Sequence, residues 1–258
     1  MDSTRFFKRD GIRLAFQEKG KGDPVLLIHG FASSGYVNWV LSGWFQILTE
    51  KGYRAIAIDN RGHGSSDKSY DSAFYRLDSM AYDAAALLTH LGIEKAHVMG
   101  YSMGAKISAC MALRVSEKVR SVVFGGLGIG LVTGTENWHT VAEALLVNDL
   151  KMITNARAMM FRKFADSTRS DRKALAACLM LEKKDLTVTE VRQIKSPVLV
   201  AVGTKDEISG KPEPLVSLLS KGELLLIPER NHMLAVGDKI YKEGVLKFFE
   251  RHRMKSSF

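Results

Sequence analysis

Short apolar runs alternate with longer helix-like segments along most of this chain. A run of roughly four to eight apolar residues suits a strand that is buried on both faces, as in a parallel sheet. The runs are PVLLIHG, YRAIAIDN, KAHVMG, VRSVVFGG, SPVLVAVG and ELLLIP. Their alternation with helices predicts an α/β fold with a mostly parallel, doubly wound sheet and right-handed crossovers.

The segments between these runs have helical composition or turn signals. Asp10-Gly11 stands between two apolar runs near the N-terminus, which predicts a β-hairpin. Helix C-termini are expected at Gly52 and Gly92, because glycine adopts the left-handed conformation that ends many helices. Helices are expected over WVLSGWFQILTEKG, LDSMAYDAAALLTHLG and MGAKISACMALRVSE, near Pro214 to Leu219, and over about Lys239 to Arg251.

The alternation of strand-like and helical segments stops between Leu127 and about Ile194. This stretch contains no strand-like run and has helical segments such as AEALLV, ARAMMFRKFA and RKALAACLMLEKK. We interpret residues 127–194 as a helical insertion between two parts of a sheet domain, residues 1–126 and 195–258. Insertions at the carboxyl ends of strands often build ligand sites in α/β proteins.

Composition excludes several classes of protein. The 258 residues are 46% hydrophobic and carry a net charge of +9. Nine Lys and Arg against three acids fall between Lys151 and Lys184, which we interpret as a solvated helical face. No basic motif with interleaved aromatic residues accompanies them, so nucleic-acid binding is not expected. No apolar run is long enough to span a membrane, and the N-terminus does not resemble a signal peptide. Two cysteines without CxxC spacing, Cys110 and Cys178, fit a cytoplasmic protein with reduced, buried thiols.

The segment HVMGYSMGAK contains a G-x-S-x-G pattern, with Ser102 between Gly100 and Gly104. It follows a predicted strand and precedes a predicted helix, which is the context that a nucleophilic serine on a sharp turn requires. Glycines on either side let the strand and the helix approach closely. Ser102 is therefore the candidate nucleophile.

A serine hydroxyl needs a base and an orienting acid to become a good nucleophile. His232 follows the apolar strand ELLLIP, and in a parallel sheet it lies on the same edge as Ser102. Asp206 follows SPVLVAVG in the same way, with the neighbouring Glu207 as its main competitor. The loop after SVVFGG offers no carboxylate. We therefore predict that Asp206 and His232 act with Ser102.

These elements in this order resemble the α/β-hydrolase superfamily over nearly the whole chain. The resemblance rests on HGF at residues 29–31, DNRGHGSSD at 59–67, the GYSMGA elbow, and Asp206 and His232 in turn. It implies Ser102 as nucleophile, His232 as general base and then acid, and Asp206 as the residue that orients the imidazole. It also implies an oxyanion hole from the backbone N–H groups of Phe31 and Met103, and no metal or organic cofactor.

The resemblance also implies that the insertion is a cap over the active site. Some apolar residues of the cap and its loops could line an acyl pocket, although most of them would pack the cap onto the sheet. The candidates are Leu127, Ile129, Trp138, Met160, Phe161 and Met233. In this family the RGHG segment is a structured turn, so Asp59, Arg61 and His63 are expected to hold that turn. His29 is expected to shape the oxyanion loop by hydrogen bonding.

The leading functional hypothesis is a serine hydrolase that cleaves a carboxylic ester, a thioester or a lactone through an acyl-enzyme. Small carboxylesterases, enol-lactonases and cofactor-free haloperoxidase-like esterases share the motif set, and carbon–carbon bond hydrolases of ring-fission products are also similar. Acyl transfer to an alcohol and a non-catalytic ligand receptor on the same fold are the remaining alternatives. The basic cap suggests a small-molecule substrate with a negative group.

Overall fold

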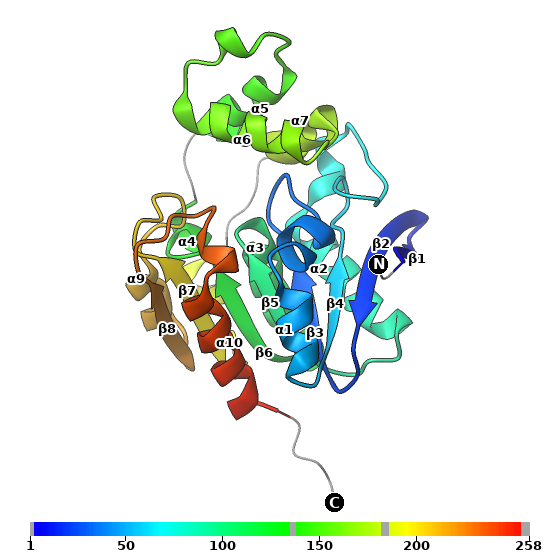
Figure 1. Ribbon diagram of the computed structural model, residues 1–258, viewed down its shortest axis with the longest axis vertical. Helices are drawn as coiled ribbons and strands as arrows, with labels where there is room; N and C mark the ends of the chain where they lie inside the picture. The colour runs from blue at the N-terminus through cyan, green and yellow to red at the C-terminus, as the bar shows by residue number, and fades with distance from the viewer. Residues whose placement is uncertain (1–2, 135–137, 182–185, 254–258) are drawn as a thin grey trace, which may run out of the picture.

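A computed structural model of the protein describes residues 3–134, 138–181 and 186–253. Its centre is an eight-stranded sheet in the order β1-β2-β4-β3-β5-β6-β7-β8 (Figure 1). β1 pairs antiparallel with β2, and β2 pairs antiparallel with β4, whereas every other neighbouring pair is parallel. The strands are β1 (Arg5–Arg9), β2 (Ile12–Lys19), β3 (Asp23–Ile28), β4 (Tyr53–Ile58), β5 (Ala96–Tyr101), β6 (Val119–Gly125), β7 (Val198–Gly203) and β8 (Gly222–Ile227).

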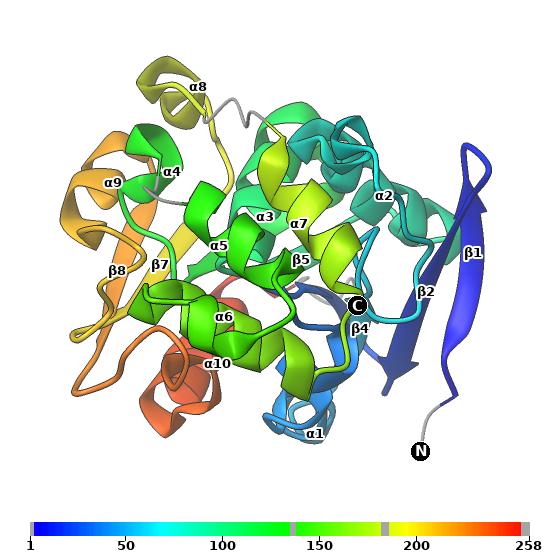
Figure 2. The same ribbon diagram turned by 90° about the horizontal axis from the view of Figure 1, so that it is seen from above.

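Helices cover both faces of the sheet (Figure 2). One face packs against α1 (Trp44–Glu50) and α10 (Lys239–Arg251), and the other against α2 (Leu77–His90), α3 (Met103–Arg114) and α9 (Pro212–Leu218). Side chains along a strand point alternately to the two faces. In β3, accordingly, Val25 and Leu27 join the core under α1 and α10, while Leu26 and Ile28 join the core under α2 and α3. The predicted α/β fold with a mostly parallel, doubly wound sheet is confirmed.

The predicted hairpin is present at Asp10-Gly11. Both residues have positive φ, 49° and 80°, as a tight two-residue turn between twisted strands requires. The turn sets the β1–β2 register, with Arg9 opposite Ile12.

The single helix expected over residues 39–52 is wrong. The structure has a short π-helix, η1 (Tyr36–Val40), and then α1, which begins at Trp44. Gly43 separates them with a φ of 81°, a left-handed conformation that a continuous helix cannot include. The break lets Trp39 and Trp44 pack edge to face in the core beneath the sheet.

The described residues between 127 and 194 contain helices and no strand. They are α4 (Gly130–Thr133), α5 (Trp138–Leu146), η4 (Leu150–Met152), α6 (Ala156–Ser167), α7 (Arg172–Met180) and α8 (Val188–Arg192). Figure 1 shows α5, α6 and α7 together above the edge where the parallel strands end. The remaining short elements are η2 (Ser72–Tyr75), η3 (Ser116–Lys118) and η5 (Ala235–Gly237). The division into domains at residues 127 and 194 stays a prediction.

Hydrogen bonding and aromatic packing hold the segment above the sheet against the loop after β3. The Thr168 hydroxyl donates to the Ala32 carbonyl at 2.9 Å. The Phe31 ring packs edge to face on Trp138 of α5 and Phe161 of α6. The loop that follows β3 is therefore shared between the sheet and the helices above it.

A buried histidine in β5 makes the stability of the protein depend on pH. His97 is fully buried, and its Nδ1 lies 2.7 Å from the Ser121 hydroxyl. Burial, together with the positive charge of Arg120 and other cations, lowers the pKa of His97 from 6.5 to about 3. Above pH 6.5 the histidine is neutral in both the folded and the unfolded chain. Below it the unfolded chain binds a proton that the folded chain excludes, so stability falls until the pH reaches about 3.

We expect His97→Asn to remove this dependence, because the asparagine amide can reach the Ser121 hydroxyl but does not titrate. Urea unfolding between pH 7 and pH 4 measures the effect. As the pH drops below 6.5, wild type should lose about 1.4 kcal/mol per pH unit more than the variant. Parallel pH profiles for the two proteins would show that His97 titrates normally in the fold.

Candidate active site

Ser102 stands on a sharp turn between β5 and α3. Its backbone has φ 54° and ψ −113°, a strained conformation for a residue with a side chain. The Ser102 N–H donates to the Gly125 carbonyl of β6 at 2.8 Å, which ties the turn to the neighbouring strand. A Cβ on Gly100 would lie 2.1 Å from the Gly104 carbonyl oxygen, so the strand and the helix can meet only without a side chain there.

The side chains of Ser102, His232 and Asp206 form a continuous line of hydrogen bonds. The Ser102 Oγ lies 2.9 Å from Nε2 of His232, and Nδ1 of His232 lies 2.8 Å from Oδ2 of Asp206. Because an ionised carboxylate only accepts hydrogen bonds, Nδ1 carries the proton and Nε2 accepts the serine O–H. An imidazole held in this way can take up a proton from the hydroxyl.

Asp206 is held rigidly by the start of the loop after β7. Its Oδ1 accepts backbone N–H groups of Ile208 and Ser209 at 2.8 and 3.0 Å, and its Oδ2 accepts the Ser209 hydroxyl at 2.6 Å. Burial raises the pKa of this carboxyl, but the hydrogen bonds and charge of His232, with those of Ser209, outweigh burial and hold the pKa below its usual value. The Asp206 side chain is completely buried, whereas the competing Glu207 is exposed.

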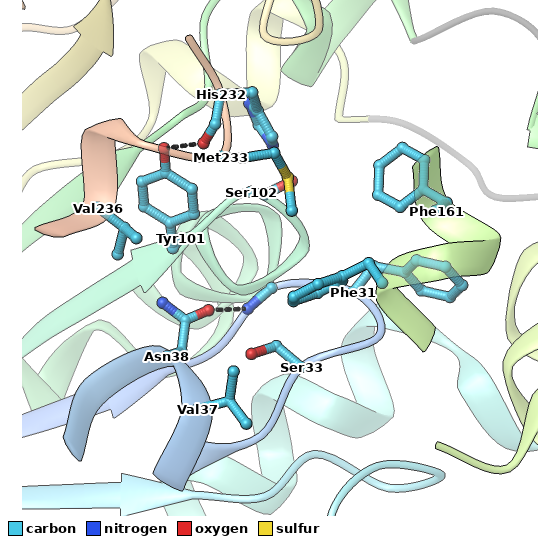
Figure 3. A pocket seen from close by; sticks show the side chains of 12 residues that line it. Phe31, Ser33, Val37, Asn38, Tyr101, Ser102, Phe161, His232, Met233 and Val236 are labelled. Atoms are coloured by element: carbon cyan, nitrogen blue, oxygen red, sulfur yellow. Dashed lines mark hydrogen bonds between the residues drawn. The ribbon is translucent and has the colours of Figure 1, made fainter. Parts of the chain in front are cut away.

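Tyr101 positions the loop that carries His232, and the sequence did not indicate this. Its hydroxyl donates to the His232 backbone carbonyl at 2.6 Å (Figure 3). Burial raises the pKa of Tyr101 well above its usual value, so the hydroxyl keeps the proton that it donates. The only signal in the sequence is its place directly before Ser102.

The loop after β3 lies beside Ser102. A Cβ on Gly30 would lie 3.5 Å from Cβ of Ser102, and the Gly30 N–H is fixed by the side-chain oxygen of Asn38 at 3.0 Å (Figure 3). Asn38 comes from η1 and was also missed. In the part of the chain that the structure describes, the backbone N–H groups of Phe31 and Met103 have no hydrogen-bond acceptor. Two donors next to the serine are thus available to a bound group.

His29 holds this loop through both ring nitrogens. Its Nε2 lies 3.0 Å from the Asn60 N–H, which can only donate, so Nε2 is the acceptor. Its Nδ1 therefore carries the proton and donates to the Gly30 carbonyl at 2.7 Å. Burial lowers the pKa of His29 to about 4, so the imidazole is neutral at pH 7. His29 shapes the loop by hydrogen bonding, as expected.

The residues of the RGHG segment make structural contacts. Asp59 accepts backbone N–H groups of Gly35 and Ser65 at 2.7 and 2.8 Å. Arg61 forms two hydrogen bonds to Asp83 in the core, at 2.7 and 2.8 Å. The His63 ring packs on the Phe31 ring. The Asp59 and His63 contacts connect the turn to the loop after β3, and the Arg61 contact connects it to α2.

Two cavities meet at Ser102, and Phe31 lines both of them. The His232 cavity has a volume of about 180 Å³, and its other lining residues include Val37, Asn38, Phe164, His232, Met233 and Val236. The Lys106 cavity has a volume of about 250 Å³, and its other lining residues include Met103, Lys106, Leu127, Trp138, Leu179 and Ile208. Most of these side chains are apolar, as in typical small-molecule sites.

The predicted pocket residues divide into three groups. Phe161 and Met233 line the His232 cavity, and Leu127 and Trp138 line the Lys106 cavity. Ile129 and Met160 line neither cavity among the residues that the structure describes. The Ile129 N–H donates to the Lys211 carbonyl at 2.9 Å, which places this residue against the loop before α9. Met160 instead packs on the hydrophobic core.

The described cations of the basic segment do not line the two cavities. None of its described Lys and Arg side chains, from Lys151 to Lys173, lines either one, and Lys183 and Lys184 lie outside the described residues. Arg162 is buried and donates to the carbonyl groups of Ala144 and Val147 at 2.8 and 2.6 Å. Arg162 therefore connects α6 to the end of α5.

Residues 3–134, 138–181 and 186–253 contain no group of three or more His, Cys, Asp or Glu side chains arranged to hold a metal ion. They also contain no helix with the length and apolar character needed to cross a membrane. Both cysteines are buried, and burial raises the pKa of the Cys110 thiol.

The chain is similar to known proteins over most of its length. It is 25% identical to a non-heme haloperoxidase of Rhodococcus erythropolis, with 93% of this chain and 97% of that protein covered. It is 28% identical to the dihydrolipoyllysine-residue acetyltransferase component of the acetoin cleaving system of Pseudomonas putida, covering 90% of this chain but only 64% of that protein. The structure of an esterase from Exiguobacterium antarcticum has the same fold, with a TM-score of 0.79, 18% identity, and 97% and 100% of the two chains covered.

A family model independently covers more than half of the chain. The model, described as alpha/beta hydrolase fold, matches residues 23–174, from the start of β3 to the first part of α7. The matched segment includes the loop after β3 and the turn that carries Ser102. The chain belongs to the alpha/beta hydrolase fold family.

Proposed function

We propose that this protein is a serine hydrolase that cleaves a carboxylic ester, a thioester or a lactone through an acyl-enzyme on Ser102. One observation carries the proposal: the hydrogen-bonded line from Ser102 through His232 to Asp206 ends at a serine that lines two largely apolar cavities. Burying polar side chains costs free energy unless every one of them is hydrogen-bonded, so stability alone does not explain this line of polar residues.

In the first step, the Ser102 Oγ attacks the substrate carbonyl carbon while Nε2 of His232 takes the hydroxyl proton. Asp206 stabilises the imidazolium through Nδ1 and remains ionised. When the tetrahedral intermediate collapses, the carbonyl–heteroatom bond breaks and Nε2 returns the proton to the leaving alcohol or thiol. The acyl group stays on Ser102 as an ester.

In the second step, water replaces the leaving group. Nε2 of His232 takes a proton from the water as its oxygen attacks the acyl-enzyme, and then returns that proton to the Ser102 Oγ. The products are the carboxylic acid and the free enzyme, so atoms and charge balance without another reactant.

The backbone N–H groups of Phe31 and Met103 are the proposed oxyanion donors. Each donor of this kind contributes about 3 to 4 kcal/mol to the stability of the transition state. Asn38 and His29 keep the loop that carries Phe31 in place. Because an amide donates, the side chain at position 31 is free to serve another purpose, here packing on the aromatic residues of α5 and α6.

A fluorophosphonate probe tests the assignment of the nucleophile. Ser102 should be labelled rapidly at pH 7.5, because its hydroxyl lies on Nε2 of His232 and the Phe31 and Met103 amides can donate to the phosphonyl oxygen. Mass spectrometry of the digested adduct identifies the labelled residue. Ser33, which also lines the His232 cavity, is the internal control and should stay unlabelled. A label on Ser33 or Ser209 in place of Ser102 would contradict the mechanism.

A further inference from the structure

Asn38 lines the His232 cavity, and its amide nitrogen has no hydrogen-bond acceptor among the described residues. The side-chain oxygen accepts the Gly30 N–H at 3.0 Å. Because a backbone N–H can only donate, this bond fixes which end of the amide is oxygen and turns the nitrogen to the other side. The side chain therefore offers two N–H groups that no described residue uses.

The Asn38 amide is almost entirely shielded from solvent. Asn38 is only 7% exposed, yet its amide nitrogen keeps accessible surface. Figure 3 shows this nitrogen on the side of Tyr101 and Val236, facing away from Ser33. A shielded donor without a partner costs free energy, and a bound acceptor would recover that cost. The amide is thus prepared for a polar atom of a ligand.

The acceptor that fits this donor is a neutral oxygen. The described lining of the His232 cavity contains no Lys or Arg, so a carboxylate there would bring a charge without a counter-ion. Most polar side chains of the cavity already have partners. The Tyr101 hydroxyl donates to the His232 carbonyl, and the Ser102 hydroxyl lies on Nε2 of His232.

The position of Asn38 assigns it to the leaving group of the substrate. The general acid must reach the leaving-group atom, and His232 lines this cavity but is not among the described lining of the Lys106 cavity. A Cβ on Gly30 would lie 3.5 Å from Cβ of Ser102 and 3.7 Å from Oδ1 of Asn38. The width of one glycine therefore separates the amide from the nucleophile, and a short leaving group spans it.

From this geometry we infer that the leaving alcohol of the natural substrate carries a second, neutral oxygen, which accepts a hydrogen bond from the Asn38 amide. The substrate class is the ester of a short diol, polyol or hydroxy ether. This inference rests on the proposed function. It gives the two ends of one side chain different tasks, because the oxygen holds the loop that carries Phe31 and the nitrogen selects the leaving group.

Two esters of equal length isolate this oxygen. Methoxyethyl butanoate and butyl butanoate differ in one ether oxygen, which replaces a methylene group of the leaving alcohol. Asn38→Asp keeps an oxygen for the Gly30 N–H, but an ionised carboxylate has no N–H or O–H to donate. The ratio of the two kcat/KM values, ether over alkyl, should fall about 3- to 10-fold from its wild-type value, the range for one neutral hydrogen bond. A loss that both esters share cancels in this ratio.

Ser33→Ala is the matched control for the ratio. Ser33 also lines the His232 cavity, and the substitution also removes a polar group, but the Asn38 amide nitrogen faces away from it (Figure 3). The ratio for this variant should stay within about twofold of wild type. An unchanged ratio in Asn38→Asp, or a fall in Ser33→Ala in its place, would overturn recognition by the amide and leave hydrolysis at Ser102 intact.

Calorimetry on Ser102→Ala adds a readout without turnover and with Asn38 unchanged. The methoxyethyl ester should bind at least about threefold more tightly than the butyl ester, because the butyl chain leaves the amide desolvated and unpaired. Equal binding of the two esters would overturn the site. If wild type hydrolyses neither ester faster than Ser102→Ala does, the proposed function is overturned, and the binding comparison still decides the role of Asn38.

Discussion

Ser102→Ala is expected to lower kcat for ester hydrolysis by at least about a thousandfold. The substitution removes the proposed nucleophile, and it leaves His232 and Asp206 in their hydrogen bond. Residual activity should come from water in place of the hydroxyl, because the proposed oxyanion donors, the Phe31 and Met103 amides, remain in place. KM should change little, since most of the lining of both cavities is untouched.

Initial rates with p-nitrophenyl pentanoate, measured under saturating conditions, give this ratio. Ser33→Ala is the matched control, because it also deletes a hydroxyl from the His232 cavity but touches neither His232 nor Asp206. Its kcat should stay within about tenfold of wild type. Thermal unfolding of both variants checks that the fold is retained. A Ser102→Ala protein with wild-type kcat would show that the reaction takes place at another nucleophile.

The strands could be predicted because burial on both faces leaves a simple pattern. β3, β4, β5, β6 and β7 are short apolar runs in the sequence, and their described residues are almost all buried. The break at Gly43 was missed because a helix pattern continues on both sides of it. Helix α8 was not predicted, although the sequence contains a signal for its start. Thr187 and Glu190 form a capping box there.

The proximity of Ser102, Asp206 and His232 could be predicted from topology. Each follows a strand of a parallel sheet, so their side chains meet at one edge whatever lies between them in the sequence. Their catalytic roles stay predictions. Cavity lining is different, because it depends on how each helix above the sheet is rotated. Phe161 lines a cavity while Met160, its neighbour on α6, packs on the core.

Gly104→Ala is expected to destabilise the fold by more than about 4 kcal/mol, or to prevent folding. Alanine is the best helix former, and Gly104 has no positive φ, so its backbone conformation suits alanine. Steric overlap alone opposes the change. The new Cβ would lie 2.0 Å from the carbonyl oxygen of Ile28 and 2.7 Å from that of His29. Both are backbone atoms at the end of β3, and they cannot turn aside as a flexible side chain can.

Gly237→Ala is the control, because a Cβ at that position would meet no atom within 4 Å. It should change the free energy of unfolding by less than about 1 kcal/mol. Urea unfolding measures both variants, and wild-type stability for Gly104→Ala would mean that α3 does not pack on β3 as described. If Gly104→Ala folds at low temperature, α3 must move away from β3 to admit the methyl group. That movement separates the Met103 amide from the Phe31 amide, so kcat should fall even in the folded fraction. We therefore expect the glycine that permits close packing of α3 on β3 also to keep the two proposed oxyanion donors facing one substrate atom.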